Sequence, residues 1–107
     1  PLIKPLIDIP AMANVIARMV QTSLDSFVHQ DAAAARQVCE MDDEVDETYA
    51  DLYQELLGFI AEGGNPQRAT QAVNLLIIAR FLERIADHAT NIGENVIYFL
   101  SGERDSC

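Results

Sequence analysis

The chain has 107 residues, of which half are hydrophobic and 22% are charged, a composition typical of one folded domain rather than a disordered segment. Seven basic residues against seventeen acidic ones give a net charge of −10, which argues against partners such as nucleic acid or anionic lipid. No apolar run approaches the roughly 18 residues that span a bilayer, so no direct membrane insertion is expected. Cys39 and Cys107 stand far apart without a CxxC motif, which favours a reducing, cytoplasmic location.

The first predicted helix covers about residues 9–29. It follows the stretch DIP, and Pro10 suits a first helical turn because the N–H that proline lacks would have no partner there. Apolar residues then recur at spacings of three and four, as a helix that buries one face requires. The residues predicted to form this buried row are Met12, Ile16, Met19 or Val20, Leu24 and Phe27.

The second predicted helix covers about residues 32–62, with Asp31 as its N-cap. Its apolar positions alternate by three and four over the whole length, the seam pattern of helical bundles. The stretch EGGNP at 62–66 then ends it, because glycine favours a helix C-terminus. The predicted inward row is Val38, Met41, Val45, Tyr49, Leu52, Leu56 and Phe59.

The third predicted helix covers about residues 66–101, with Asn65 as N-cap, Pro66 in the first position and Gly102 as the stop. Connections this short require neighbouring helices to be antiparallel. The sequence therefore predicts an all-α fold, an antiparallel up-down-up three-helix bundle formed by one domain over residues 1–107. The predicted buried row of the third helix is Leu82, Ile85, Ala89, Ile92, Val96 and Phe99.

A polar row on the third helix lies roughly opposite this apolar row. At about 100° per residue its members fall within about 80° of arc. They are Arg80, Glu83, Asp87, Asn91, Glu94 and Tyr98. A solvated face that keeps the bundle soluble explains such a row, and Arg80 with Glu83 or Arg84 with Asp87 would form ion pairs at i,i+3.

The second helix repeats the spacing of the carboxylates. Asp42 and Asp46 are four residues apart at the edge of its packing face, and the segment 40–55 holds eight acidic residues and no basic one. Two such pairs on adjacent antiparallel helices would concentrate hard oxygen ligands suited to Mg²⁺, Ca²⁺, Mn²⁺ or iron. From spacing alone, a solvated face and a surface metal site both remain open.

A metalloenzyme of the ferritin type requires Glu-x-x-His motifs on its helices. Neither His29 nor His88 is preceded by a glutamate at that spacing. We therefore expect a non-catalytic protein, with a carboxylate-bridged metalloenzyme and a purely structural bundle as the alternatives.

Two stretches, ARFLERIADHATNIGENVIYFLSGE and VCEMDDEVDETYADL, closely resemble the PhoU family of phosphate-transport regulators, specifically the C-terminal of its two three-helix units. The resemblance implies E/D-x-x-x-D motifs that bind metal ions on the bundle surface, as an iron cluster or as Zn, Mn or Mg. The matching metal ligands are Asp42, Asp46, Glu83 and Asp87, and the flanking residues are Arg80, Asn91 and Glu94.

The resemblance also implies an adaptor in transcription regulation by phosphate. Such a protein couples the ATPase of a phosphate ABC transporter to a membrane-bound sensor histidine kinase and holds the phosphate regulon off when phosphate is plentiful. The family pattern has two units where this chain has one, and the chain begins with Pro1. We therefore expect a fragment of a longer protein, and a homo-oligomer formed through the surface that a second unit would cover.

Overall fold

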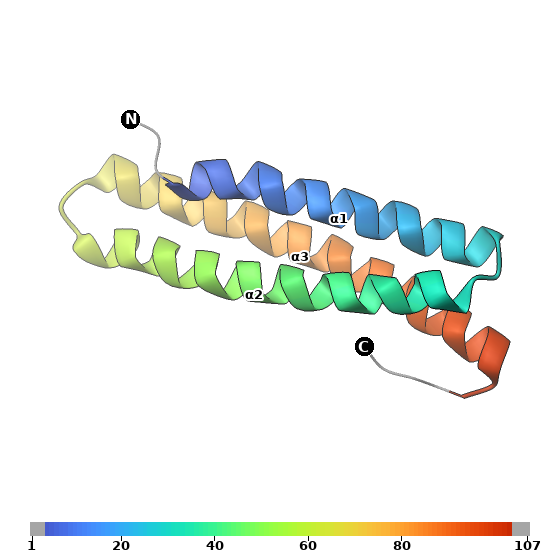
Figure 1. The fold of residues 1–107 in the computed structure, drawn as a ribbon. Coiled ribbons are helices and arrows are strands. Elements are labelled where there is room, and N and C mark those ends of the chain that lie inside the picture. Colours follow the sequence, from blue (N-terminus) through green and yellow to red (C-terminus); the bar gives the residue numbers. More distant parts are fainter. Residues whose placement is uncertain (1–3, 104–107) are drawn as a thin grey trace.

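The computed structural model describes residues 4–103, which form three long helices: α1 (Lys4–Val28), α2 (Ala32–Glu62) and α3 (Pro66–Ser101). The helices follow one another in alternating directions, and each packs against the other two (Figure 1). No strand occurs among the described residues, and the bundle measures 55 × 21 × 15 Å. The predicted all-α three-helix bundle is confirmed.

The helix ends follow local chemistry. The carboxylate of Asp31 accepts a hydrogen bond from the Ala34 amide at 3.1 Å, and the side-chain oxygen of Asn65 accepts from two amides at the start of α3. Gly63 and Gly102 end α2 and α3 with positive φ angles of 67° and 77°, which glycine adopts without strain. Both predicted N-caps and the predicted stop at Gly102 are thus confirmed.

The predicted start of α1 is wrong. The helix begins at Lys4 and continues through Pro10, so Pro5, and not Pro10, stands in its first turn. Proline inside a helix loses the hydrogen bond of its own amide and crowds the carbonyl four residues earlier, and the burial of Ile9 and Met12 on either side of Pro10 opposes this cost.

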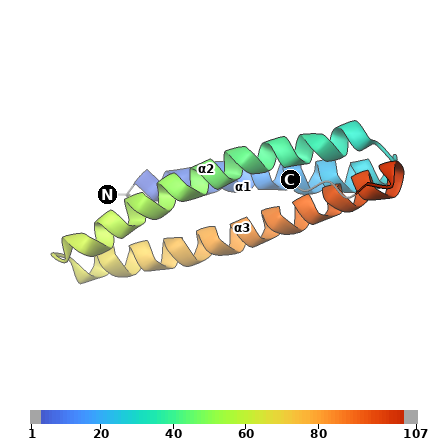
Figure 2. The same ribbon diagram turned by 90° about the horizontal axis from the view of Figure 1, so that it is seen from below.

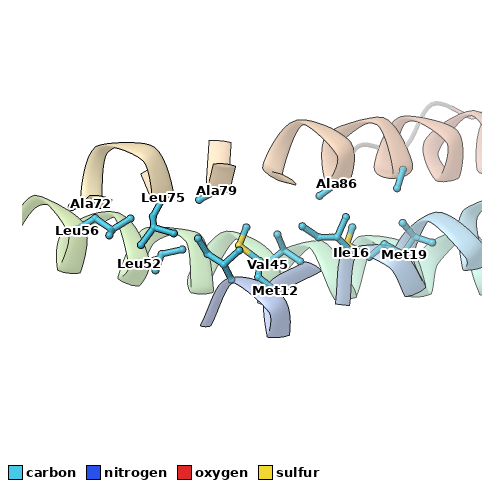
Figure 3. Packing of buried hydrophobic residues seen from close by; sticks show 13 residues of the cluster. Met12, Ile16, Met19, Val45, Leu52, Leu56, Ala72, Leu75, Ala79 and Ala86 are labelled. Atoms are coloured by element: carbon cyan, nitrogen blue, oxygen red, sulfur yellow. The ribbon is translucent and has the colours of Figure 1, made fainter. Parts of the chain in front are cut away.

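The core lies along the bundle axis, where α1 and α2 contribute the long side chains and α3 mostly short ones. Figure 3 shows the alanines of α3 facing methionine, isoleucine, valine and leucine side chains of the other helices. Short side chains let α3 approach its neighbours closely. The cluster comprises Ile9, Met12, Ile16, Met19, Val38, Val45, Leu52, Leu56, Ala72, Leu75, Ala79, Ala86 and Ala89.

The buried row of α3 differs from the predicted one. Ile85 and Phe99 are 45% and 90% exposed, because the positions that face α1 and α2 are held by smaller residues. Leu24 and Phe27 of α1, also predicted to be buried, are 46% and 65% exposed. Most buried positions of α3 hold alanine, threonine or glycine, which the search for large apolar side chains does not identify. The buried residues of α3 are Ala72, Leu75, Ala79, Ala86, Ala89, Thr90, Gly93, Val96 and Ile97.

Gly93 marks a close approach of α3 to α2. A Cβ atom at this position would stand 3.1 Å from the carbonyl oxygen of Ala35 and 3.7 Å from the Cβ of Val38. The contact fixes how the two helices are aligned along their length.

Within residues 4–103, none of the helices combines the length and hydropathy needed to cross a membrane. Cys39, half-buried on α2, is disulfide-bonded.

Candidate functional site

The four carboxylates predicted as metal ligands lie along the seam between α2 and α3. The two helices are antiparallel and run side by side (Figure 2). Because Gly93 meets Ala35 and Val38, residues earlier on α3 meet residues later on α2. The turn of α3 at 83–87 therefore lies beside the turn of α2 at 42–46. We call Asp42, Asp46, Glu83 and Asp87 the acidic seam cluster.

The members of the cluster differ in burial. Asp42 and Glu83 are half-buried, whereas Asp46 and Asp87 are exposed. The Oδ1 atom of Asp42 is buried and has no hydrogen-bond partner. A buried carboxylate oxygen without a partner costs free energy, because it has lost its hydrogen bonds to water and forms none within the protein.

Burial and mutual repulsion raise the pKa values of three of these groups. The pKa of Asp42 rises from 3.8 to about 6, first through burial and then through the charges of Asp46, Asp87, Asp43 and Glu83. Burial and the charges of Asp87 and Asp43 raise the pKa of Asp46. Burial also raises the pKa of Glu83, with Asp46 and Asp87 adding to it and Arg80 opposing it. The carboxylates of the two helices therefore act on one another across the seam.

The structure also places the flanking residues. Arg80 lies close enough to act on the charge of Glu83, in line with its predicted position beside the cluster. Asn91 is exposed and Glu94 half-buried, one and two turns beyond Asp87. Asp43 adds its charge to Asp42 and Asp46 but was not among the predicted site residues. Its signal in the sequence was its place in the acidic segment 40–55.

The sequence predicts that the acidic row of α3 faces directly away from the core. In the structure this row borders the core instead. Ala86 is fully buried, and at about 100° per residue Glu83 and Asp87 lie only about 60° and 100° from it around the helix. The guanidinium of Arg84 lies 5.6 Å from the centre of the Phe81 ring, a cation–π contact. The small buried residues of α3 thus turn the acidic row toward α2.

The cluster meets the chemical requirements of a hard cation better than the geometric ones. Its donors are all carboxylate oxygens, the ligands preferred by Mg²⁺, Mn²⁺ and oxidised iron, and one of them is buried without a partner. Within residues 4–103, however, no three acidic, histidine or cysteine side chains converge so as to hold one ion. Binding would therefore require rotation of side chains, which the exposed Asp46 and Asp87 can undergo without disturbing the core.

The raised pKa of Asp42 predicts that the metal-free chain loses stability as pH rises from about 4 to 6. Between 3.8 and about 6 the folded state binds the Asp42 proton more tightly than the unfolded state does, so stability falls with increasing pH. After allowance for solvent screening, we expect a loss of about 1–2 kcal/mol. Urea unfolding at a series of pH values, with a chelator present, measures it. Stability that rose over this interval would contradict the prediction.

The model of the PhoU domain family matches residues 9–96. The chain belongs to the PhoU family. It is 41% identical over 107 residues to the phosphate-specific transport system accessory protein PhoU homolog 2 of Thermotoga maritima, a match covering all of this chain and 45% of that protein. PhoU homologs of Aquifex aeolicus and Clostridium acetobutylicum are 42% and 34% identical over 103 and 93 residues, covering 96% and 87% of this chain and 46% and 42% of theirs. The chain spans less than half the length of these PhoU relatives.

Proposed function

We propose that this chain is a regulatory, metal-binding domain of a phosphate-specific transport system, and that it is not an enzyme. The names of its PhoU relatives describe accessory proteins of such systems. The observation that carries the metal-binding part is the acidic seam cluster with the unpartnered Oδ1 of Asp42.

The acidic seam cluster would hold the metal, with Asp42 and Asp46 contributed by α2 and Glu83 and Asp87 by α3. A bound cation would balance the negative charges of these carboxylates. Asp42 would contribute its half-buried carboxylate, and the exposed Asp46 and Asp87 would contribute theirs from the outer edge of the seam. Because two helices contribute, binding would also tie α2 to α3. The all-oxygen donor set is compatible with iron, manganese or magnesium, and carboxylates also bind zinc.

A regulatory role is favoured over a catalytic one by the position of the cluster. Asp46 and Asp87 are exposed along the outer edge of the seam. An enzyme built on bridged carboxylates would hold its metal inside the bundle, on helices that carry Glu-x-x-His motifs. Neither described histidine stands in such a motif.

We further propose that the domain works at the cytoplasmic face of the membrane. There it would link the ATPase of a phosphate ABC transporter to a sensor histidine kinase and keep phosphate-responsive transcription off when phosphate is plentiful. Membership of the PhoU family and the names of the relatives support this role. Calorimetric titration of the chain with the purified ATPase, with and without metal, tests it. Absence of binding in both conditions would overturn the adaptor role of this domain.

The metal-binding part predicts that the purified chain, incubated with iron, manganese, zinc or magnesium and then desalted, retains metal in elemental analysis. Asp46→Ala combined with Asp87→Ala should remove most of the retained metal, because it deletes one ligand from each helix. Glu47→Ala combined with Asp51→Ala is the matched control, since it removes two exposed charges from α2 outside the cluster. A wild-type chain that retains no metal would refute the site, as would equal losses in both double variants.

A further inference from the structure

A groove of about 340 Å³ lies between α2 and α3, and extends from the acidic seam cluster toward the connection between the two helices. Aromatic rings from both helices line it, together with two arginines of α3 and no acidic residue. Tyr49 and Leu76 are half-buried, and the other lining residues are exposed. We call it the α2–α3 groove. Its lining residues are Tyr49, Tyr53, Leu76, Ile77, Arg80, Phe81 and Arg84.

The walls of the α2–α3 groove carry exposed apolar side chains. Ile77 and Phe81 of α3 are 49% and 57% exposed, and Tyr53 of α2 is 38% exposed. The apolar surface continues one turn further along the helices at Val73 and Leu57, which are 42% and 38% exposed. From roughly 150–200 Å² for a fully exposed side chain of this size, these residues present on the order of 400 Å² of apolar surface. An interface of this size is typical of weak, reversible association.

The shape of the groove suits a helix. Val73, Ile77 and Phe81 are spaced by four, so they form a line on one side of α3 that extends over about 12 Å. Tyr53 and Leu57 repeat this spacing on α2. A further helix packed between the two lines would place apolar residues at i, i+3 or i+4, and i+7 over these side chains, as amphipathic helices do in the grooves that bind them. The three-helix bundle would then become a four-helix bundle.

The two arginines determine which helix the groove can accept. They are two of the seven basic residues in a chain with a net charge of −10. The guanidinium of Arg84 lies 5.6 Å from the centre of the Phe81 ring, and Arg84 is not among the charges that act on the raised pKa values of the acidic seam cluster. Its charge is therefore available to a carboxylate of a partner, which a guanidinium binds through two parallel hydrogen bonds.

The acidic seam cluster limits where such a partner can carry negative charge. Glu83 stands between Arg80 and Arg84 in the sequence, and Asp46 precedes Tyr49 by about one turn. A carboxylate of the partner would be attracted beside the arginines but repelled one turn further along the seam. The complementary helix therefore has an apolar row that is followed by a single acidic turn.

We propose that the α2–α3 groove docks an amphipathic helix of another protein, whose apolar row packs on the walls of the groove and whose acidic turn binds Arg80 and Arg84. Tyrosine and arginine are enriched among the residues that contribute most to binding at protein interfaces, and both line this groove. The proposal goes beyond the proposed function, which names neither a docking surface nor the chemistry of the partner. It also does not depend on bound metal.

Selection from a library of helical peptides displayed on phage tests the docking site. The full chain is the target, and a chelator is present so that no metal takes part. The selected peptides should carry apolar residues at spacings of three and four, followed within one turn by aspartate or glutamate, and should bind with micromolar dissociation constants. Failure to select any peptide, or selection of basic peptides, would overturn the proposal.

Two neighbouring isoleucines show whether the selected peptides occupy the groove. Ile77→Ala should raise the dissociation constant about tenfold, because Ile77 lines the groove. Ile78→Ala is the matched control, since Ile78 is 45% exposed but is not a lining residue. It should change the dissociation constant by no more than about twofold. Circular dichroism shows whether each variant keeps its helices, and equal losses of affinity in the two variants would refute the docking site.

A change of charge tests the contact with the arginines. Arg84→Glu should weaken peptide binding about tenfold or more, whereas Arg18→Glu makes the same change of charge on α1 and should have little effect. A peptide in which lysine replaces the acidic residue should bind Arg84→Glu more tightly than it binds the wild type. This reversal reports a direct contact even if Arg84→Glu alters the stability of the bundle.

Two further results would contradict the proposal. One is the absence of the reversal with the lysine peptide. The other is a chain that dimerises in sedimentation experiments and becomes monomeric on Ile77→Ala, because the groove would then bind a second copy and not a different protein.

Discussion

Replacing Gly93 by valine is expected to lower the free energy of unfolding by about 3 kcal/mol. A Cβ atom at Gly93 would stand 3.1 Å from the carbonyl oxygen of Ala35. That oxygen belongs to the backbone of α2, so it cannot move aside without moving the helix. Valine adds two methyl groups to a contact that is already tight for a single carbon atom. Urea unfolding followed by circular dichroism measures the loss.

The matched control is Gly58→Ala, since Gly58 lies inside α2 with no atom within 4 Å of an added Cβ. Alanine there should raise the free energy of unfolding by about 0.5–1 kcal/mol, because glycine loses more backbone entropy in a helix. If Gly93→Val changed stability by no more than the control does, the close approach of α2 and α3 would be refuted.

The effect of Gly93→Val should extend to the acidic seam cluster. The contact of Gly93 with Ala35 aligns α2 with α3, and this alignment places Asp42 beside Glu83 and Asp87. A valine at position 93 would push the helices apart one turn and a half from Asp87. Gly93, which lies outside the acidic seam cluster and has no side chain, thus sets the distance between the carboxylates of α2 and those of α3.

The helix ends could be predicted from the sequence because their causes are local. The side chains of Asp31 and Asn65 bond amides two or three residues away, and Gly102 needs only its own freedom at positive φ. Such interactions depend on residues adjacent in the chain. The start of α1 could not be placed in the same way, because Pro10 is tolerated inside a helix that packs well on both sides of it.

The buried face of α3 could not be predicted from hydrophobicity alone. Ala79, Ala86 and Gly93 are buried because they allow close approach to α1 and α2, a property of the packed bundle. The larger Ile85 and Phe99 give a stronger apolar signal but form an exposed surface. Their periodicity is real, but it marks an exposed side of α3 and not the buried one.

The candidate site was only partly predictable for a related reason. The spacing of four between Asp42 and Asp46, and between Glu83 and Asp87, is visible in the sequence. That the two pairs act on each other across the seam depends on the alignment of α2 with α3. So does the burial of one Asp42 oxygen without a partner.

Replacing Asp42 by asparagine is expected to have opposite effects on stability and on metal binding. At pH 7 the variant no longer buries a charge or opposes Asp46 and Asp87, so its free energy of unfolding should exceed that of the metal-free wild type by about 1–2 kcal/mol. Its stability should also lose most of the pH dependence between about 4 and 6, because the group whose pKa is raised has been removed. Urea unfolding at several pH values measures both effects.

The same variant should lose the stabilisation that the wild type gains from a divalent cation, since the central carboxylate is absent. Thermal unfolding with and without Mn²⁺ should therefore show a large shift for the wild type and little for Asp42→Asn. Asp51→Asn is the matched control, because Asp51 is exposed on α2 and is not among the charges that act on Asp42. It should change the free energy of unfolding by no more than about 0.5 kcal/mol. A metal-free Asp42→Asn variant less stable than the wild type would show that Asp42 is paired within the fold, and the case for a cation at the seam would lose its main support.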